Sequence, residues 1–340
     1  MPASKVTSLD VARLAGVSQA AVSRVFTPGA SASPETARKV REAAEALGYR
    51  PNRLARSLNT GRSRIVGLVI GYLENHFYPE ALQLISSALQ AEGYHVLVFL
   101  TGRVDEDVEA VVEEILDYQV DAVIAASVGM SSDLGRRAKA AGVPVVLFNR
   151  SQDDPSMSAV ASDNRAGGRK VADFLVAGGH RRIAYIAGWE SASTQRDREE
   201  GFREGLAAHG LDLFARAVGE FEAEAAKQAA RDLFSAAERP DAVFVANDHM
   251  ALPVMDVIRH ELGLRIPQDV SVVGYDDAPP AGWPSYDLTT VRQDTPAMVA
   301  ACVEIILEGI DDRAAPPRRV ALGGPLIVRG SARVPDGWDG

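Results

Sequence analysis

The sequence is poor in the features that mark exported or membrane-bound proteins. Its 340 residues include a single cysteine, Cys302, so no disulfide can form within the chain. Because Cys302 stands in the apolar stretch ACVEIIL, we interpret it as a packed core thiol rather than a nucleophile. No apolar run approaches the roughly 18 residues that span a membrane. The opening MPASKVTSLD has no apolar segment typical of a signal peptide. We therefore expect a cytoplasmic protein without membrane contact.

Motifs of catalysis and of cofactor binding are also missing. The sequence has no GxSxG turn and no GxxxxGK[ST] phosphate loop, and its six histidines are scattered without zinc-ligand spacing. His180, in the segment GGHRRI, is interpreted as a turn or crossover residue rather than a base. We therefore expect no enzymatic activity, no cofactor and no metal site.

Charge is divided unevenly along the chain, whose net charge is −10. Residues 1–64 carry eleven Lys and Arg against four Asp and Glu, a net +7. The remaining residues carry 25 basic and 42 acidic side chains, a net −17. A basic first segment ahead of an acidic body indicates that only the first segment meets a polyanion. Basic segments also bind membranes and acidic proteins, so charge alone does not identify the partner.

Two short helices joined by a glycine are predicted within SLDVARLAGVSQAAVSRVF, residues 8–26. Thr7 or Ser8 can cap the first helix. Gly16 allows a turn with positive φ, and Ser18 can cap the second helix. Two helices that meet at a glycine turn are typical of the helix-turn-helix motif.

A third helix is predicted from Pro34, with Ser33 as its cap, to about Leu47. A generic helical bundle would explain these three helices equally well. The continuation GYRPNRLARSLNTGRSR favours a more specific interpretation, because residues 52–58 form a basic helix too short to be stable in water. Its leucines have nothing nearby to bury them. Such a helix is typical of a segment that folds on DNA and inserts a leucine into the minor groove.

The motifs DVA, AGVS, VSRV, LGYRPN and ARSL, in this order, make residues 7–64 resemble the DNA-binding head of the LacI/GalR family. The resemblance implies that residues 18–24 form the recognition helix in the major groove, with Gln19, Ala20 and Arg24 near base edges. Ala21 stands where many members carry Thr, and Thr27 where Asn often follows the helix. These departures leave the base preference open.

The resemblance also assigns the remaining contacts to DNA. Ser18 and Ser23 match phosphate-side positions, Leu58 matches the hinge leucine of the minor groove, and Ala55 matches the residue that faces the partner's hinge. The implied DNA-binding residues are Ser18, Gln19, Ala20, Ser23, Arg24, Asn52, Ala55, Arg56 and Leu58. Further basic residues are candidates for phosphate contacts (Arg38, Arg41 and Arg62) or for solvated surface (Arg13 and Lys39).

From Ile65 the hydrophobic pattern changes to alternating strands and helices. The strands IVGLVIG, HVLVFL, DAVIAA and PVVLF are separated by amphipathic helices, and a second set begins near Asp163. Repeated strand–helix units predict doubly wound parallel sheets. Two such lobes form a hinged binding protein, whose ligand lies beyond the carboxyl ends of the strands. The expected fold class is α/β, with a small all-α helix-turn-helix head and a two-lobed, doubly wound core.

The body resembles the core of the same family, itself similar to periplasmic sugar-binding proteins. The motifs are SDNRAGG, GGHRRIAYIAG, RDREEGFREGL, VFVANDHMALPVMDVIR, LRIPQDVSVVGYDDAP, YDLTTVRQD and LIVRGSARVP. The resemblance implies crossings between lobes near Asp163, Arg292 and Leu322. The expected domains are a head (1–50), a hinge helix and linker (51–64), a first lobe (65–163 with 292–322) and a second lobe (164–291 with 323–340).

Several polar and aromatic residues follow strand ends and suit a sugar or nucleoside, which needs hydrogen-bonding groups and an apolar plate. Arg198 offers a planar fork of donors, and Phe221 matches a family position that presents an aromatic ring. Phe77 lies in NHFY, where many members read NPFF, so His76 replaces a proline. The expected effector-binding residues are Phe77, Asn149, Arg198, Phe221, Asn247 and Asp276.

Each of these assignments has a structural alternative. Phe221 could pack in the core, and Asp276 could cap the turn after its strand. Arg198 could pair with a carboxylate such as Glu199 or Asp276, and Arg150 could do the same with another. The shared location after strand ends favours a common ligand site.

The sequence thus predicts a transcriptional regulator, in the first instance a repressor, whose affinity for operator DNA is controlled by a small-molecule effector such as a sugar. Two heads on a pseudo-palindromic operator require a homodimer, and no leucine-heptad tail that would join dimers follows RVPDGWDG. Two alternatives are a transporter's solute-binding protein, against which the basic head and the missing export signal argue, and a sugar-modifying enzyme on the same scaffold.

Overall fold

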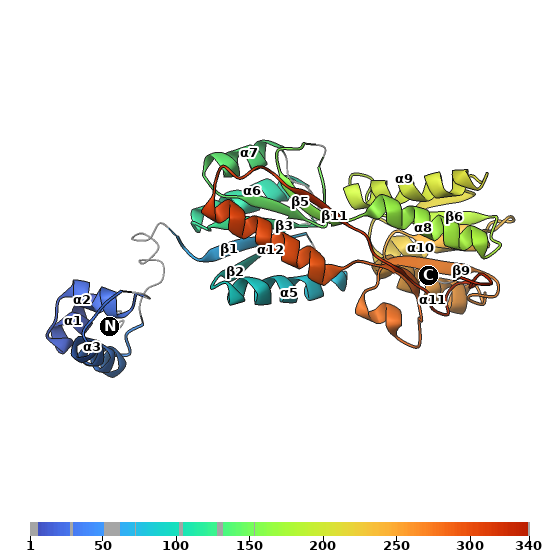
Figure 1. Cartoon of the computed structure of the whole chain (residues 1–340). Coiled ribbons are helices and arrows are strands. Elements are labelled where there is room, and N and C mark those ends of the chain that lie inside the picture. The colour runs from blue at the N-terminus through green and yellow to red at the C-terminus, as the bar shows by residue number, and fades with distance from the viewer. Residues whose placement is uncertain are drawn as a thin grey trace. The chain divides into compact units, whose positions relative to one another are not determined.

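The computed structural model describes residues 6–27, 30–50, 62–71, 73–101, 105–127, 132–152 and 154–338. The chain divides into two compact units, a head (Met1–Ser63) and a core (Arg64–Gly340) (Figure 1). Among the described residues, no helix has the length and apolar character needed to cross a membrane. The same residues contain no group of three or more His, Cys, Asp or Glu side chains placed to hold a metal ion.

The described part of the head contains the three predicted helices, α1 (Ser8–Ala15), α2 (Gln19–Val25) and α3 (Pro34–Leu47). Thr7 caps α1 in a capping box with Asp10, and Gly16 ends it with a φ of 67°. Ser18 caps α2, and Ser33 caps α3 ahead of the proline. The helices share a small core of Val11, Ala12, Val22, Val40, Ala43 and Ala44.

The first lobe of the core is built on a parallel sheet with the strand order β11-β5-β4-β3-β1-β2. Its strands are β1 (Ile65–Ile70), β2 (His95–Leu100), β3 (Ala122–Ala126), β4 (Val145–Phe148), β5 (Ser158–Ser162) and β11 (Arg319–Leu322). Helices α5 (Phe77–Ala91) and α12 (Thr295–Asp311) cover one face, and α6 (Asp105–Asp117) and α7 (Ser132–Ala140) cover the other (Figure 1). The hydrophobic pattern predicted neither β5 nor β11.

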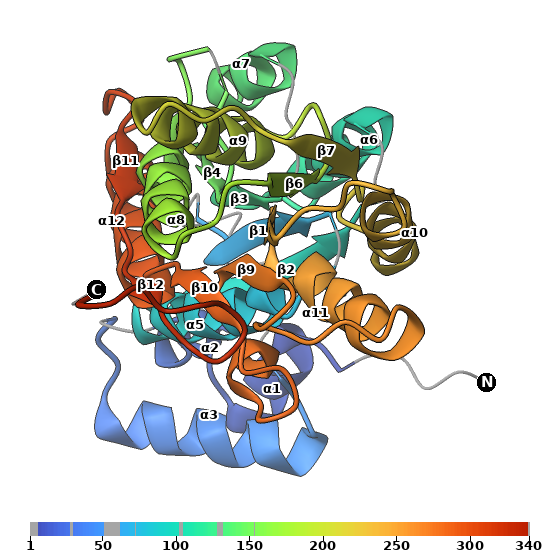
Figure 2. The ribbon, with the colours of Figure 1, turned by 90° about the vertical axis from the view of Figure 1, so that its right-hand side faces the viewer.

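The second lobe has a sheet with the strand order β12-β10-β9-β8-β6-β7. Its strands are β6 (Ile183–Ala187), β7 (Ala215–Val218), β8 (Ala242–Val245), β9 (Ser271–Asp276), β10 (Thr289–Arg292) and β12 (Leu326–Ile327). The pairing is parallel except that β12 runs antiparallel to β10. Helices α8 (Asn164–Ala177) and α9 (Ser193–Ala208) lie on one face, opposite α10 (Ala223–Phe234) and α11 (Asp248–Asp256) (Figure 2). The described elements also include a π-helix (Val257–Glu261) and a 3₁₀ turn (Pro279–Gly282).

Three segments join the lobes, between β5 and α8, between β10 and α12, and between β11 and β12. The second and third are in direct backbone contact at Gly324, where an added Cβ would lie 1.8 Å from the Arg292 carbonyl oxygen. The Ser162 and Tyr275 hydroxyls, 2.9 Å apart, share a hydrogen bond beside the first segment. At Gly324, the contact between the second and third segments therefore leaves no room for a side chain.

Candidate functional site

Helix α2 of the head presents an exposed polar face to solvent. Gln19, Ala20, Ser23 and Arg24 are exposed, whereas Val22 turns into the core. The Ser18 hydroxyl, also exposed, accepts a 3.2 Å hydrogen bond from the Ala21 N–H and so fixes the start of the helix. The five residues that the sequence assigned to this helix therefore lie at the surface, as major-groove contacts require.

Basic side chains around α2 form exposed ion pairs within the head. Arg38 lies 2.9 Å from Glu42, Lys39 lies 2.8 Å from Glu35, and Arg13 lies 3.8 Å from Asp10. Exposed pairs of this kind are weak, so these cations can exchange their partners for phosphate at little cost. The predicted hinge contacts Asn52, Ala55, Arg56 and Leu58 lie outside the described residues.

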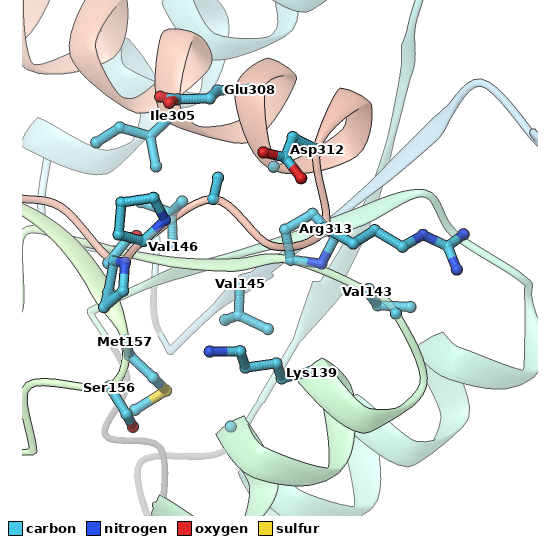
Figure 3. A pocket seen from close by; sticks show the side chains of 18 residues that line it. Lys139, Val143, Val145, Val146, Ser156, Met157, Ile305, Glu308, Asp312 and Arg313 are labelled. Carbon is cyan, nitrogen blue, oxygen red and sulfur yellow. The ribbon is translucent and has the colours of Figure 1, made fainter.

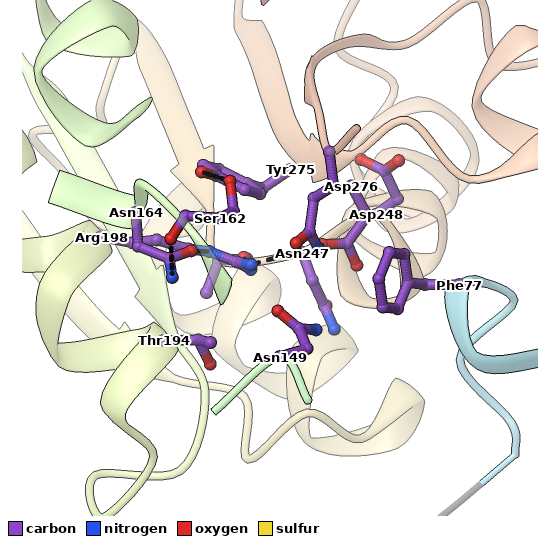
Figure 4. A network of polar contacts seen from close by, with 12 residues as sticks. Phe77, Asn149, Ser162, Asn164, Thr194, Arg198, Asn247, Asp248, Tyr275 and Asp276 are labelled. Atoms are coloured by element: carbon purple, nitrogen blue, oxygen red, sulfur yellow. Dashed lines mark hydrogen bonds and ion pairs between the residues drawn. The ribbon is translucent and has the colours of Figure 1, made fainter. Parts of the chain in front are cut away.

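A buried polar cluster lies where the two lobes of the core meet (Figure 4). It contains Asn149 after β4, Asn247 after β8, Asp276 at the end of β9 and Arg198 on α9. Each of these four side chains is almost fully buried, at 2–4% exposure. The rule that ligands lie beyond the carboxyl ends of parallel strands thus selected residues that the fold brings together from both lobes.

The Arg198 guanidinium is held on several sides within this interlobe cluster. Its Nε donates to Asn164 Oδ1 at 2.8 Å, and its Nη1 donates to the Ala246 carbonyl oxygen at 2.5 Å. Its Nη2 lies 3.4 Å from Asp276 Oδ1, and the guanidinium stacks 3.7 Å from the Tyr275 ring centroid. Of the two alternatives raised for Arg198, pairing with Asp276 is therefore observed.

The backbone of α9 packs closely against α8, and this contact fixes the position of the Arg198 backbone. A Cβ added to Gly168 on α8 would lie 2.2 Å from the Arg198 carbonyl oxygen. Glu199, the other candidate partner of Arg198, turns to Arg203 and Arg216 instead. The guanidinium is therefore directed toward the lobe junction by packing as well as by its hydrogen bonds.

Asp276 is a buried acceptor rather than a turn cap. Its oxygens accept from Arg198, from Gln293 Nε2 at 2.7 Å and from Asn75 Nδ2 at 3.3 Å. Burial raises the pKa of Asp276, and the nearby Arg198 charge opposes that rise. Burial together with the neighbouring Asp276 raises the pKa of Asp248 well above its ordinary value. The cluster is therefore held by hydrogen bonds to acidic side chains in a largely desolvated site.

The two predicted aromatic residues, Phe77 and Phe221, are both buried in the core. Phe77 stacks on Phe148 at 6.4 Å between ring centroids and lies close to Asp248 and Asp276 in Figure 4. Phe221 packs edge-on against Trp189 at 5.5 Å, and the Arg150 guanidinium lies 5.9 Å from its ring centroid. The core packing proposed as the alternative for Phe221 is thus present, next to a cationic side chain of the other lobe.

Several side chains that the sequence analysis did not select also join the lobes. Asn75 of the first lobe reaches Asp276, Arg150 donates to Thr194 Oγ1, and the Ser151 N–H donates to Ser193 Oγ at 2.9 Å. Within the described residues, Arg150 contacts hydroxyls and not the carboxylate considered for it. Gln293 directly follows β10 in TTVRQD, so the strand-end rule could have selected it.

Two buried oxygens in the interlobe cluster accept no hydrogen bond from the described residues. Asn149 Nδ2 donates to the Tyr78 hydroxyl at 3.2 Å and Gln293 Nε2 donates to Asp276, but Asn149 Oδ1 and Gln293 Oε1 have no partner. Buried acceptors normally receive a hydrogen bond. Both oxygens can therefore receive a hydroxyl or N–H donor from a bound molecule.

A separate pocket of about 680 Å³, counting the open space at its mouth, lies on the first lobe near the start of β4 and the end of α12 (Figure 3). Its lining includes the apolar side chains of Val145, Met157 and Ile305 and the charged side chains of Lys139 and Glu308. It contains none of the predicted effector-binding residues. This pocket is therefore distinct from the interlobe cluster.

Comparison with known proteins finds a matching family model for the head and another for the core. Residues 7–52 match the family described as bacterial regulatory proteins, lacI family, and residues 172–332 match the periplasmic binding protein-like domain. The chain is 36% identical to the HTH-type transcriptional regulator CelR of Thermobifida fusca, over 94% of this chain and 96% of that protein.

Solved structures agree with this assignment. A complex of the regulator CelR with cellobiose has 33% identity and a TM-score of 0.73, over 96% of this chain and all of that one. The lac repressor dimer bound to operator and the anti-inducer ONPF has 30% identity and a TM-score of 0.86, over 96% and 99%. The family and the fold class predicted from the sequence are confirmed. The chain belongs to the lacI family of bacterial regulatory proteins and is a helix-turn-helix transcriptional regulator, not an enzyme.

Proposed function

We propose that this regulator is a homodimeric, cytoplasmic repressor whose operator affinity is set by a neutral sugar bound in the interlobe cluster. The observation that carries the proposal is the set of buried polar side chains drawn from both lobes to one place, two of them with an unsatisfied oxygen. A polyol can supply hydroxyl donors to Asn149 and Gln293 and accept from the Arg198 fork. The cellobiose bound by the relative CelR is a ligand of this chemistry.

The charge of the cluster favours a neutral effector over an anion. Asp248 and Asp276 lie together, and the positive charge of Arg198 is already paired with Asp276. A carboxylate or phosphate would add negative charge beside buried carboxyl groups, which is costly in a desolvated site. A sugar adds no charge, and Phe77 and Phe221 can face its apolar ring surfaces.

In this proposal the effector acts by changing how the lobes meet. Asn75–Asp276 and Arg150–Thr194 link opposite lobes, so a ligand between them favours whichever arrangement it fits better. The segment 51–64 would pass that preference to the heads, with Asn52, Ala55, Arg56 and Leu58 as its contacts to DNA. The proposed domains are the head (1–50), the hinge helix and linker (51–64), the first lobe (65–163 with 292–322) and the second lobe (164–291 with 323–340). Each head would place α2 in one major groove of a pseudo-palindromic operator.

The proposal is tested by measuring operator affinity and sugar binding on the same full-length protein. A duplex enriched from randomised DNA serves as operator, and cellobiose with other neutral mono- and disaccharides is titrated calorimetrically and into the complex. We expect one sugar to bind and to change operator affinity. Sugar binding without any sequence-selective DNA binding would favour a transporter's binding protein, and conversion of the sugar would favour the enzyme.

A further inference from the structure

One side-chain contact joins the recognition helix to the helix before it. Gln19 Nε2 donates a 2.9 Å hydrogen bond to Ser8 Oγ. Ser8 is the first residue of α1 and Gln19 the first residue of α2, so the bond spans the glycine turn between them. The Gln19 amide is otherwise exposed on the face that carries Ala20, Ser23 and Arg24. The flexible Gln19 side chain, on the face of α2 predicted to contact bases, is thus held by a hydrogen bond at its Nε2 atom.

The bond leaves the Gln19 amide with a definite recognition pattern. A side-chain amide has two N–H donors and one carbonyl oxygen, and Ser8 engages one of the donors. The groups that remain are one N–H and the oxygen Oε1. In the major groove, adenine presents the matching pair, the N7 acceptor and the N6–H donor. Guanine presents two acceptors, N7 and O6, and so requires both N–H groups of the amide.

We propose that Ser8 is a specificity-determining residue, whose hydroxyl orients the Gln19 amide to read one adenine in each operator half-site. The inference rests on the proposed function, in which α2 enters the major groove. Ser8 acts through Gln19 and needs no contact with DNA itself. Fixing the amide before binding reduces the freedom that the long glutamine side chain loses when it meets the base.

The surrounding residues allow this effect to be isolated. The cap and capping box of α1 are formed by Thr7 and Asp10, so the start of the helix does not depend on Ser8. Alanine is moreover a better helix former than serine. Ser31 supplies a matched control, because it is an exposed serine of the head with no described side-chain contact to α2. The neighbouring Ala20 has no polar atom with which to compensate for Gln19.

The test is enrichment of randomised, two-fold symmetric duplexes by the full chain and by the variants Ser8→Ala, Ser8→Thr and Ser31→Ala, followed by affinities for single-base changes. We expect the wild type to prefer adenine over guanine at one half-site position by about five- to a hundredfold. In Ser8→Ala the preference for adenine over guanine should be about two- to tenfold weaker. The base preferences at the other operator positions should stay unchanged. Ser8→Thr, which keeps the hydroxyl, and Ser31→Ala should match the wild type.

Three results would overturn the assignment: a guanine preference at that position, an unchanged adenine preference in Ser8→Ala, or the same loss in Ser8→Thr as in Ser8→Ala. A loss spread over all positions, with a lowered melting temperature, would assign Ser8 to folding and would equally overturn it. Failure of the wild type to enrich any sequence is a different outcome, because it overturns the proposed function on which the inference rests.

Discussion

Arg198 and Asp276 form an ion pair that solvent scarcely reaches, with Nη2 and Oδ1 3.4 Å apart and each side chain 3% exposed. The pair links α9 to the end of β9 across the second-lobe side of the interlobe cluster. A buried charge that loses its partner remains desolvated and uncompensated. Arg198 therefore has a structural role in the free protein in addition to the ligand contact proposed for it.

We expect Arg198→Ala to lower the free energy of unfolding by about 3–5 kcal/mol, because it leaves the Asp276 carboxyl buried without its cation. Sugar binding should be lost as well. Arg196→Ala, at an exposed position of the same helix, is the control and should change neither property by much. Chemical denaturation and calorimetric titration measure the two effects. A stable variant that binds sugar with wild-type affinity would contradict both the structural role and the ligand contact assigned to Arg198.

The adjacent glycines 323 and 324 give a matched pair for the connection between the lobes. A Cβ at Gly324 would lie 1.8 Å from the Arg292 carbonyl oxygen, whereas a Cβ at Gly323 would meet nothing within 4 Å. We expect Gly324→Ala to push the two segments apart and to lower the free energy of unfolding by about 1–3 kcal/mol. Gly323→Ala should leave it nearly unchanged. Equal effects of the two substitutions in thermal or chemical unfolding would contradict this account of the crossing.

Asp248 should make stability depend on pH in a direction opposite to that of a surface carboxylate. Burial, reinforced by Asp276, raises its pKa well above the ordinary 3.8, so the folded state holds the proton more tightly than the unfolded chain. The free energy of unfolding therefore falls as the pH rises above 3.8, until the raised pKa is passed. Asp248→Asn cannot ionise, and its amide can still bond to the Ala278 N–H and to Thr290, which Asp248 contacts now.

The stability of Asp248→Asn relative to the wild type should accordingly increase with pH above 3.8 and then level off. Urea denaturation of both proteins over a pH series gives the difference directly, with the contributions of other groups cancelled. A difference that is independent of pH would mean that folding does not raise the pKa of Asp248.

Operator binding should depend steeply on salt, and the dependence should arise in the head. The logarithm of affinity is expected to fall linearly with the logarithm of salt concentration, by about 0.9 for each phosphate neutralised. A fragment of residues 65–340, which belongs to the acidic part of the chain, should not bind DNA at any salt concentration. Binding by that fragment, measured by fluorescence anisotropy, would show that the head is not the whole DNA-binding surface.

Local sequence signals sufficed for the head and for most of the core. Caps and glycine turns predicted all three head helices, and hydrophobic alternation predicted both sheets. Strand β5 was missed because SAVAS is a short run of small residues with little apolar content. The four-residue strands β10 and β11 were also missed, because TTVR and RVAL are too short to show a clear alternation. Helix α11 ends at Asp256 and continues as a π-helix, after a proline at position 253 that cannot donate a backbone hydrogen bond.

The residues of the interlobe cluster could be predicted only in part from the sequence. Residues directly after strands could be selected from the pattern, and this rule selected Asn149, Asn247 and Asp276. The role of Asp248 depends on contacts with Thr290 and Ala278, 42 and 30 residues away, which no local pattern reveals. Likewise, Asn75 reaches Asp276 over 201 residues of sequence. Long-range contacts of this kind require the fold itself.

Control of DNA binding by the interlobe cluster is tested by the operator affinity of the full chain, measured as a panel of neutral mono- and disaccharides, cellobiose included, is titrated into the protein–DNA complex. We expect at least one sugar to change the dissociation constant by about fivefold or more, and Arg198→Ala to abolish the response while the operator is still bound. If no sugar in the panel changes the wild-type affinity, or if the responding sugar acts equally on Arg198→Ala, the interlobe cluster is not the site that controls DNA binding.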